Sequence, residues 1–208
     1  MADPILYGPG YSTYTRAVRL ALEEKGVSYQ HVEVDFIHGM PEEQLARQPF
    51  GKVPAFEHDG FQLYETCAIE RYVDEAFAGP GLQPEDPRQR ARMTQIVSML
   101  DSYTYGPTVD QLVVQRLFMG DTPDEAAIEA ALPKVRKCMG ALEQLLGDQP
   151  FLAGDALSLA DLHLAPILAY FTATPESEPI LEDKPGLRRW WDVMKARESM
   201  ARTEPLLG

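Results

Sequence analysis

The spacing of apolar positions divides the chain into an N-terminal part that alternates short strands with helices and a C-terminal part that is helical throughout. Apolar runs predict strands over 5–7, 54–58 and 61–64, because short runs bounded by turn residues are typical of buried strands. Residues 28–35 are expected to form a further strand after the first helix. Apolar residues at helical spacing predict a helix over 14–22 and another that starts near 66. Residues 41–47 are expected to form a short helix or an irregular turn.

Turn residues support these boundaries. Gly8-Pro9-Gly10 closes the first strand, Gly26 is placed as a left-handed cap of the first helix, and Asp59-Gly60 predicts a hairpin. The resulting order, βαβ followed by α and then ββα, is the order of thioredoxin-like folds.

The C-terminal part follows a linker rich in proline and glycine. We expect helices over 86–118, 122–146, 158–172 and 187–197, with a bend near Gly106-Pro107 and a kink or break at Pro133, because proline removes a helical hydrogen bond. The predicted fold class is therefore α/β plus all-α: a thioredoxin-like domain over 1–79, a linker over 80–86 and an all-helical domain over 87–208.

Charge and cysteine content narrow the range of functions. The net charge of −13 argues against partners that are nucleic acids or anionic membrane surfaces, since both repel an acidic protein. Two cysteines without metal-ligand spacing, Cys67 and Cys138, suggest a reducing compartment. Without a visible signal sequence or a long apolar run, we expect a cytoplasmic protein that needs no metal.

Three motifs carry a more specific signal: Tyr7-Gly8-Pro9 with Ser12-Thr13, Pro49-Phe50-Gly51-Lys52-Val53-Pro54, and Glu65-Thr66. Together they resemble the glutathione-binding half of the cytosolic glutathione S-transferases, of the serine type that includes the phi class and related bacterial members. The resemblance extends over nearly the whole chain. It implies glutathione as a co-substrate, a small hydrophobic electrophile as the second substrate, and a homodimer.

The resemblance implies how glutathione is bound. Pro54 follows a cis peptide bond in the family, where the Val53 main chain pairs with the cysteinyl backbone of glutathione like an added strand. Glu65 and Thr66 start a helix, so they either cap it or receive the γ-glutamyl end of glutathione, and both roles are compatible. Lys52 and His38 are the candidates for the glycyl carboxylate. The family's His-Lys pair falls on Gly39 and Met40 in an ungapped count, so His38 serves only after a shift of one residue.

Ser12 is the first candidate for the catalytic residue, and Tyr7 is the alternative. Serine at this position in the family donates a hydrogen bond to the glutathione thiolate, whereas the tyrosine type uses a residue at the end of the first strand. Ser12 is also placed to cap the first helix, which is a purely structural role.

The second substrate is expected to bind against an apolar wall supplied in part by the helical domain. Tyr11, Tyr103 and Tyr105 are the candidates for this pocket, although aromatic residues at helical spacing more often belong to a core. Ser158 and Asp161 have the spacing of a capping box, which we interpret as structural.

The favoured activity is conjugation of the glutathione thiolate to hydrophobic electrophiles, a detoxification reaction. A glutathione-dependent peroxidase, isomerase or dehalogenase, or a non-catalytic glutathione-binding protein, remains as the alternative.

Overall fold

The first strand, β1 (Ile5–Tyr7), lies inside a four-stranded sheet in the computed structural model, which describes residues 3–35 and 39–205. The other strands are β2 (Gln30–Val32), β3 (Ala55–His58) and β4 (Phe61–Tyr64), and the order across the sheet is β2-β1-β3-β4. β1 runs parallel to β2 and antiparallel to β3, and β3 runs antiparallel to β4. This mixed sheet belongs to a compact unit made of residues 1–83 and 197–208.

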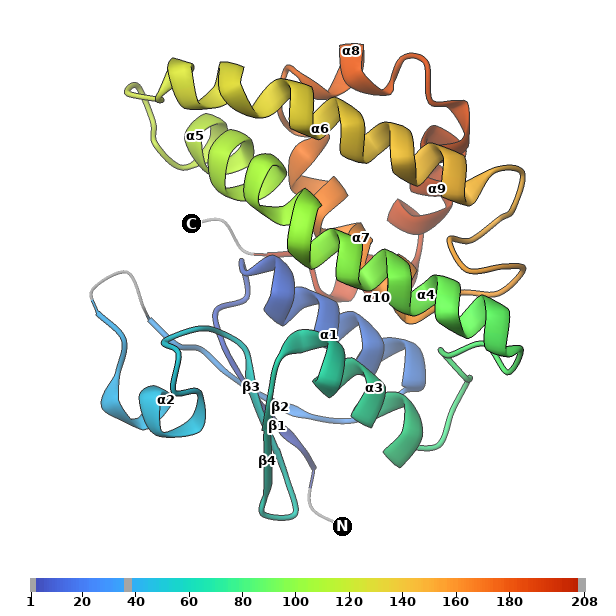
Figure 1. Cartoon of the computed structure of the whole chain (residues 1–208). Coiled ribbons are helices and arrows are strands. Elements are labelled where there is room, and N and C mark those ends of the chain that lie inside the picture. The colour runs from blue at the N-terminus through green and yellow to red at the C-terminus, as the bar shows by residue number, and fades with distance from the viewer. Residues whose placement is uncertain (1–2, 36–38, 206–208) are drawn as a thin grey trace. The chain divides into compact units, whose positions relative to one another are not determined.

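Two helices cover one face of this sheet, α1 (Thr13–Lys25) and α3 (Thr66–Ala76), while α2 (Glu42–Arg47) lies on the other side (Figure 1). The order of elements agrees with the βαβ, α, ββα order expected for a thioredoxin-like domain. Local chemistry explains the ends of α1, because the Ser12 Oγ accepts from the Thr15 N–H and Gly26 takes a left-handed φ of 69°. Asp59 and Gly60, with φ of 49° and 80°, make the β3–β4 hairpin as predicted.

The second unit, residues 84–196, is all-helical. Its elements are α4 (Pro87–Met99), the π-helical segments η1 (Leu100–Thr104) and η2 (Gly106–Val113), α5 (Val114–Leu117), α6 (Glu125–Leu146), α7 (Leu159–Phe171), α8 (Ser177–Leu181) and α9 (Pro185–Lys195). α7 is buried on nearly every side, as its apolar composition demands. The predicted fold class is confirmed, whereas the exact domain boundaries stay a prediction.

The long helix predicted over 86–118 keeps its path but changes its hydrogen-bonding pattern. The chain passes from α4 through the two π-helical segments to α5, and the predicted irregularity near Gly106-Pro107 coincides with η2. Pro107 has no N–H to give to an α-helical ladder, so the wider pattern at this point has a local cause.

The prediction of a break at Pro133 was wrong, since α6 runs through this residue. The carbonyl that loses its partner belongs to Glu129, which is exposed and can bond to water instead. The strand predicted over 28–35 is shorter, and α8 and the last helix, α10 (Glu198–Arg202), were not predicted.

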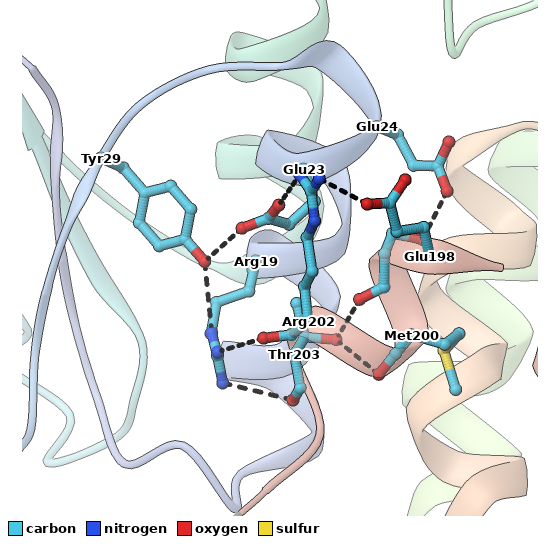
Figure 2. A network of polar contacts seen from close by, with 9 residues as sticks. Arg19, Glu23, Glu24, Tyr29, Glu198, Met200, Arg202 and Thr203 are labelled. Atoms are coloured by element: carbon cyan, nitrogen blue, oxygen red, sulfur yellow. Dashed lines mark hydrogen bonds and ion pairs between the residues drawn. The ribbon is translucent and has the colours of Figure 1, made fainter.

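Residues 197–203, which we call the α10 segment, pack on α1 within the first unit through a network of polar contacts (Figure 2). Arg197 holds the Glu24 carboxylate with two bonds of 2.7 Å. The Arg16 guanidinium donates to the Met200 carbonyl at 3.0 Å, and Arg19 donates to the carbonyls of Arg202 and Thr203, each at 3.3 Å. Arginines of α1 therefore satisfy carbonyls at the end of α10, where a short helix leaves acceptors open.

Within residues 3–35 and 39–205, no helix has the length and apolar content that a membrane span requires.

Candidate glutathione site

Strand register brings the three sequence motifs to one end of the sheet. Tyr7 pairs with Ala55, so the loop after β1 lies opposite the residues just before β3. Ala55 also pairs with Tyr64, so the start of α3 follows at the same end. The loop that carries Ser12, the Val53-Pro54 step and the Glu65-Thr66 pair are thus neighbours, although they lie far apart along the chain.

The Val53-Pro54 peptide bond is cis. Outside helices and strands, no main-chain hydrogen bond between described residues uses Val53, so its N–H and C=O are open to an extended ligand. Val53 itself is half-buried against the small cluster formed by Tyr7, Val34 and Ala55.

Two buried glutamines hold the segment before Val53 in place. The Gln48 Oε1 accepts from the N–H groups of Phe50 at 2.8 Å and Lys52 at 3.0 Å, and the Gln44 Nε2 donates to the Lys52 carbonyl at 3.2 Å. These bonds fix the backbone of Lys52 while its side chain stays exposed. Sequence reasoning missed Gln44 and Gln48, and the only available signal was a pair of polar residues four positions apart, one on a short helix and one just after it.

Glu65 and Thr66 stand where β4 gives way to α3. Glu65 has φ 72° and ψ 115°, which is unfavourable for a residue with a Cβ, and such outliers concentrate at binding sites. Its side chain is exposed and makes no capping hydrogen bond. N-capping by the Glu65 side chain therefore does not explain the unfavourable backbone conformation of this residue. The N-terminus of α3, which follows Glu65, favours an anionic ligand.

Ser12 ends the loop after β1 and caps α1. Its N–H donates to the Pro9 carbonyl at 3.0 Å, and its Oγ accepts from the Thr15 N–H at 3.3 Å. The structural role expected for Ser12 is thus present. It leaves the hydroxyl proton able to point toward a thiolate, so capping and thiol activation are compatible.

Tyr7, the alternative catalytic candidate, is buried against neighbouring side chains and is not exposed at the surface. Only 8% of its surface is exposed, and the Arg47 guanidinium covers its ring at 4.0 Å from the centroid. This cation–π contact and the cluster with Val34 and Ala55 give Tyr7 a packing role.

Tyr11 is half-buried in the same loop as Ser12. Burial raises the pKa of its phenol above the ordinary value, and the nearby charges of Asp35 and Glu33 raise it further. The phenol therefore keeps its proton at neutral pH and can serve as a hydrogen-bond donor or an apolar wall, but not as a base.

The other candidates for the second pocket lie on the π-helical segments of the second unit. Tyr103 is 69% exposed on η1, and Tyr105 lies between η1 and η2. The Cys138 Sγ donates to the Tyr103 carbonyl at 3.3 Å, so the widened segment is tied to α6. His38, the second candidate for the glycyl carboxylate, lies outside the described residues.

The predicted capping box is present in the second unit. One oxygen of Asp161 accepts from the Ser158 N–H and Oγ, at 2.8 and 2.7 Å, and the other accepts from the Leu152 N–H and the Trp190 Nε1. The carboxylate joins the start of α7 to α9, which is a structural role as expected.

Comparisons with known proteins agree with this geometry. The family profile described as glutathione S-transferase, N-terminal domain, matches residues 6–81, and the C-terminal domain profile matches residues 93–198. Glutathione S-transferase F13 of Arabidopsis thaliana is 31% identical, covering 96% of this chain and 94% of its own length, and glutathione S-transferase 3 of Zea mays is 30% identical, covering 98% and 94%.

Among solved structures, poplar glutathione transferase F1 superimposes with a TM-score of 0.87 at 32% identity, covering 98% of this chain and 97% of its own. A theta-class enzyme of Xanthomonas axonopodis pv. citri, solved with glutathione bound, superimposes with a TM-score of 0.88 at 26% identity, covering 98% and 97%.

Proposed function

The chain belongs to the glutathione S-transferase family, and from this premise we propose that it conjugates glutathione to small hydrophobic electrophiles. The thiol of glutathione loses its proton, and the thiolate attacks an electrophilic carbon. A carbon–sulfur bond forms while the leaving group departs with its electron pair, so an aryl halide yields a thioether and a halide ion.

The observation that carries this proposal is the meeting of three features at one end of the sheet: the Ser12 loop, the open main chain of Val53 before a cis Pro54, and the α3 N-terminus. An extended tripeptide that pairs with Val53 places its γ-glutamyl end at Glu65 and Thr66. Its α-carboxylate then faces the helix N-terminus and its ammonium group faces the Glu65 carboxylate. Lys52 takes the glycyl carboxylate, with His38 as a second candidate.

Ser12 then activates the thiol. A free thiol has a pKa of about 8.5, so only about 3% is ionised at pH 7. Lowering that pKa by about two units requires about 2.7 kcal/mol of preferential stabilisation of the thiolate. A hydrogen bond from the Ser12 hydroxyl to a charged sulfur contributes about 1.5–3 kcal/mol, and the N-terminus of α1 adds a further favourable field.

Tyr11 in the first unit, and Tyr103 and Tyr105 in the second, are each proposed as contact residues for the electrophile, on the grounds of aromatic character and, for Tyr103, exposure. An aromatic wall suits flat apolar substrates.

We further propose a cytoplasmic homodimer that acts in detoxification. The proposal of a dimer rests on the family to which the chain belongs. Three large apolar side chains exposed on the first unit are candidate contact residues, because burial of exposed apolar surface favours association. These are Leu45, Phe50 and Phe61, and Phe50 is 69% exposed. Sedimentation of the purified protein tests this part directly, and a monomer at micromolar concentration contradicts it.

The activity is tested by retention on immobilised glutathione followed by conjugation to an aromatic halide. We expect retention and turnover by the wild-type protein, and a fall in kcat on the order of tenfold to a hundredfold for Ser12→Ala, because the thiolate loses its hydrogen bond. Ser12→Thr keeps both the hydroxyl and the α1 cap, so it should recover most of the turnover.

Tyr7→Phe is the matched control, because it preserves the ring beneath Arg47 and removes only the phenol oxygen. Full turnover by Ser12→Ala, combined with loss in Tyr7→Phe, would assign thiol activation to Tyr7. Retention without conjugation would instead favour a glutathione-dependent peroxidase, isomerase, dehalogenase or a binding protein.

A further inference from the structure

Two polar side chains, that of His31 in β2 and that of Glu33 just after it, hold the loop that carries Ser12. Both carboxylate oxygens of Glu33 accept from the Gly10 N–H, each at 3.1 Å. The His31 Nε2 lies 2.7 Å from the Gly8 carbonyl oxygen, and because a carbonyl only accepts, this nitrogen carries the proton. The loop is therefore anchored at two points by a strand that neighbours β1.

The surroundings of Gly10 show how closely this anchor fits. A Cβ added at Gly10 would lie 3.1 Å from the Glu33 Oε1 and 3.6 Å from both the Arg19 guanidinium and the His31 ring. Arg19 is itself held by the Tyr29 hydroxyl and by two carbonyls of the α10 segment (Figure 2). Of the side chains around Gly10, Arg19 is thus held from its outer side, whereas the Glu33 side chain is largely exposed.

A short relay leads from Glu33 to Ser12. Glu33 fixes the N–H of Gly10, and the turn that follows closes through the bond from the Ser12 N–H to the Pro9 carbonyl. Displacement of Gly10 therefore moves the backbone of Ser12 and with it the direction of the hydroxyl. Displacements on the order of 1 Å at a reacting group can cost about a hundredfold in rate.

We propose that Glu33 is a positioning residue for thiol activation, acting through the Gly10 N–H to aim the Ser12 hydroxyl at the sulfur of glutathione. This inference rests on the proposed function. It gives Glu33 no contact with either substrate, and it makes the hydrogen bond, rather than the negative charge, the property that matters.

The charge and the hydrogen bond predict opposite results, so they can be separated. A carboxylate near the sulfur disfavours the thiolate, and removal of its charge alone would lower the pKa of the bound thiol. Loss of the hydrogen bond misdirects Ser12 and raises that pKa. Glu33→Gln removes the charge but keeps an acceptor for Gly10, whereas Glu33→Ala removes both.

The experiment measures the pKa of bound glutathione from the ultraviolet absorbance of its thiolate, together with kcat and KM for glutathione. We expect Glu33→Ala to raise the thiol pKa by about one unit and to lower kcat about tenfold at neutral pH. KM should change less than about threefold, because the groups that hold the tripeptide are untouched. Glu33→Gln should keep kcat near that of the wild type and leave the thiol pKa equal to or slightly below the wild-type value. Glu129→Ala, which removes an exposed carboxylate from α6, should equal the wild type in both.

A double-mutant cycle with Ser12→Ala shows whether the effect passes through Ser12. We expect Glu33→Ala to add nothing in the Ser12→Ala background. The inference is overturned if Glu33→Ala leaves the thiol pKa unchanged or lowers it, or if its effect persists undiminished without the Ser12 hydroxyl. Failure of the proposed function looks different, because the wild-type protein would then neither bind nor ionise glutathione.

Discussion

Removal of the Asp161 carboxylate should destabilise the second unit more than an ordinary core substitution does. The residue is fully buried, and its two oxygens serve three N–H donors, those of Leu152, Ser158 and the Trp190 ring, in addition to the Ser158 hydroxyl. In Asp161→Ala these N–H groups lose their acceptor at once. A buried donor without a partner costs about 1–3 kcal/mol, so the upper bound is about 9 kcal/mol.

Part of this cost is returned, because the mutant no longer buries a carboxyl group. We therefore expect Asp161→Ala to lower the free energy of unfolding by about 3–5 kcal/mol. Asp161→Asn keeps one oxygen but turns an NH₂ group toward the Ser158 N–H, which leaves a single orphaned donor and a loss of about 1–3 kcal/mol. Asp155→Asn is the control, since Asp155 is exposed in the same loop.

Tryptophan fluorescence during urea unfolding is the suitable assay, because both tryptophans of the chain, Trp190 and Trp191, lie on α9 in the second unit. Burial raises the pKa of Asp161 while its hydrogen bonds oppose the rise. Between the ordinary carboxyl pKa and the raised native pKa, the native state holds a proton that the unfolded state has released. Wild-type stability therefore falls as pH rises between these two values. Asp161→Asn should lack that fall. A loss below about 1 kcal/mol in Asp161→Ala would refute the reasoning.

Substitutions at two further residues test the first unit. Glu65→Gly should be more stable than Glu65→Ala by about 1 kcal/mol, because a residue with a Cβ is strained at φ 72°. Both variants should lose retention on immobilised glutathione. Equal denaturation midpoints for the two variants would argue against the strain. Burial acts to raise the pKa of Glu24, but hydrogen bonds from Arg197 and Ser199 lower it below the ordinary value. The stabilisation that ionised Glu24 gives the folded protein is fully present above the ordinary carboxyl pKa. It is lost as pH falls through the lower native pKa of Glu24. Glu24→Gln should therefore cost on the order of 2 kcal/mol at neutral pH and flatten the acid side of the stability profile. Melting temperatures measured across the acid range check this, and an unaltered profile would count against it.

Elements with local causes could be predicted from the sequence. The Asp59-Gly60 hairpin, the Gly26 cap and the Ser158–Asp161 box each depend on a few neighbouring residues, and all three are present. The motifs that meet at the end of the sheet were predicted through resemblance, because no local rule indicates a cis bond before Pro54.

Features that depend on distant partners could not be predicted. The π-helical segments have a local cause in Pro107, yet their extent is not encoded in any short pattern. The α10 helix has only five residues and depends on contacts with α1. Glu33 looks like an ordinary exposed acid until the strand register places it beside Gly10.

The return of residues 197–203 to α1 has a consequence for biosynthesis. A ribosome releases the N-terminal residues first, but Arg16 and Arg19 receive their acceptors on Met200, Arg202 and Thr203 only after the helical unit between them has been synthesised. The nascent thioredoxin-like unit therefore lacks the contacts with residues 197–203 while the helical unit is being synthesised. A chain cut before residue 197 would have a first unit without α10, however complete its glutathione-binding motifs are.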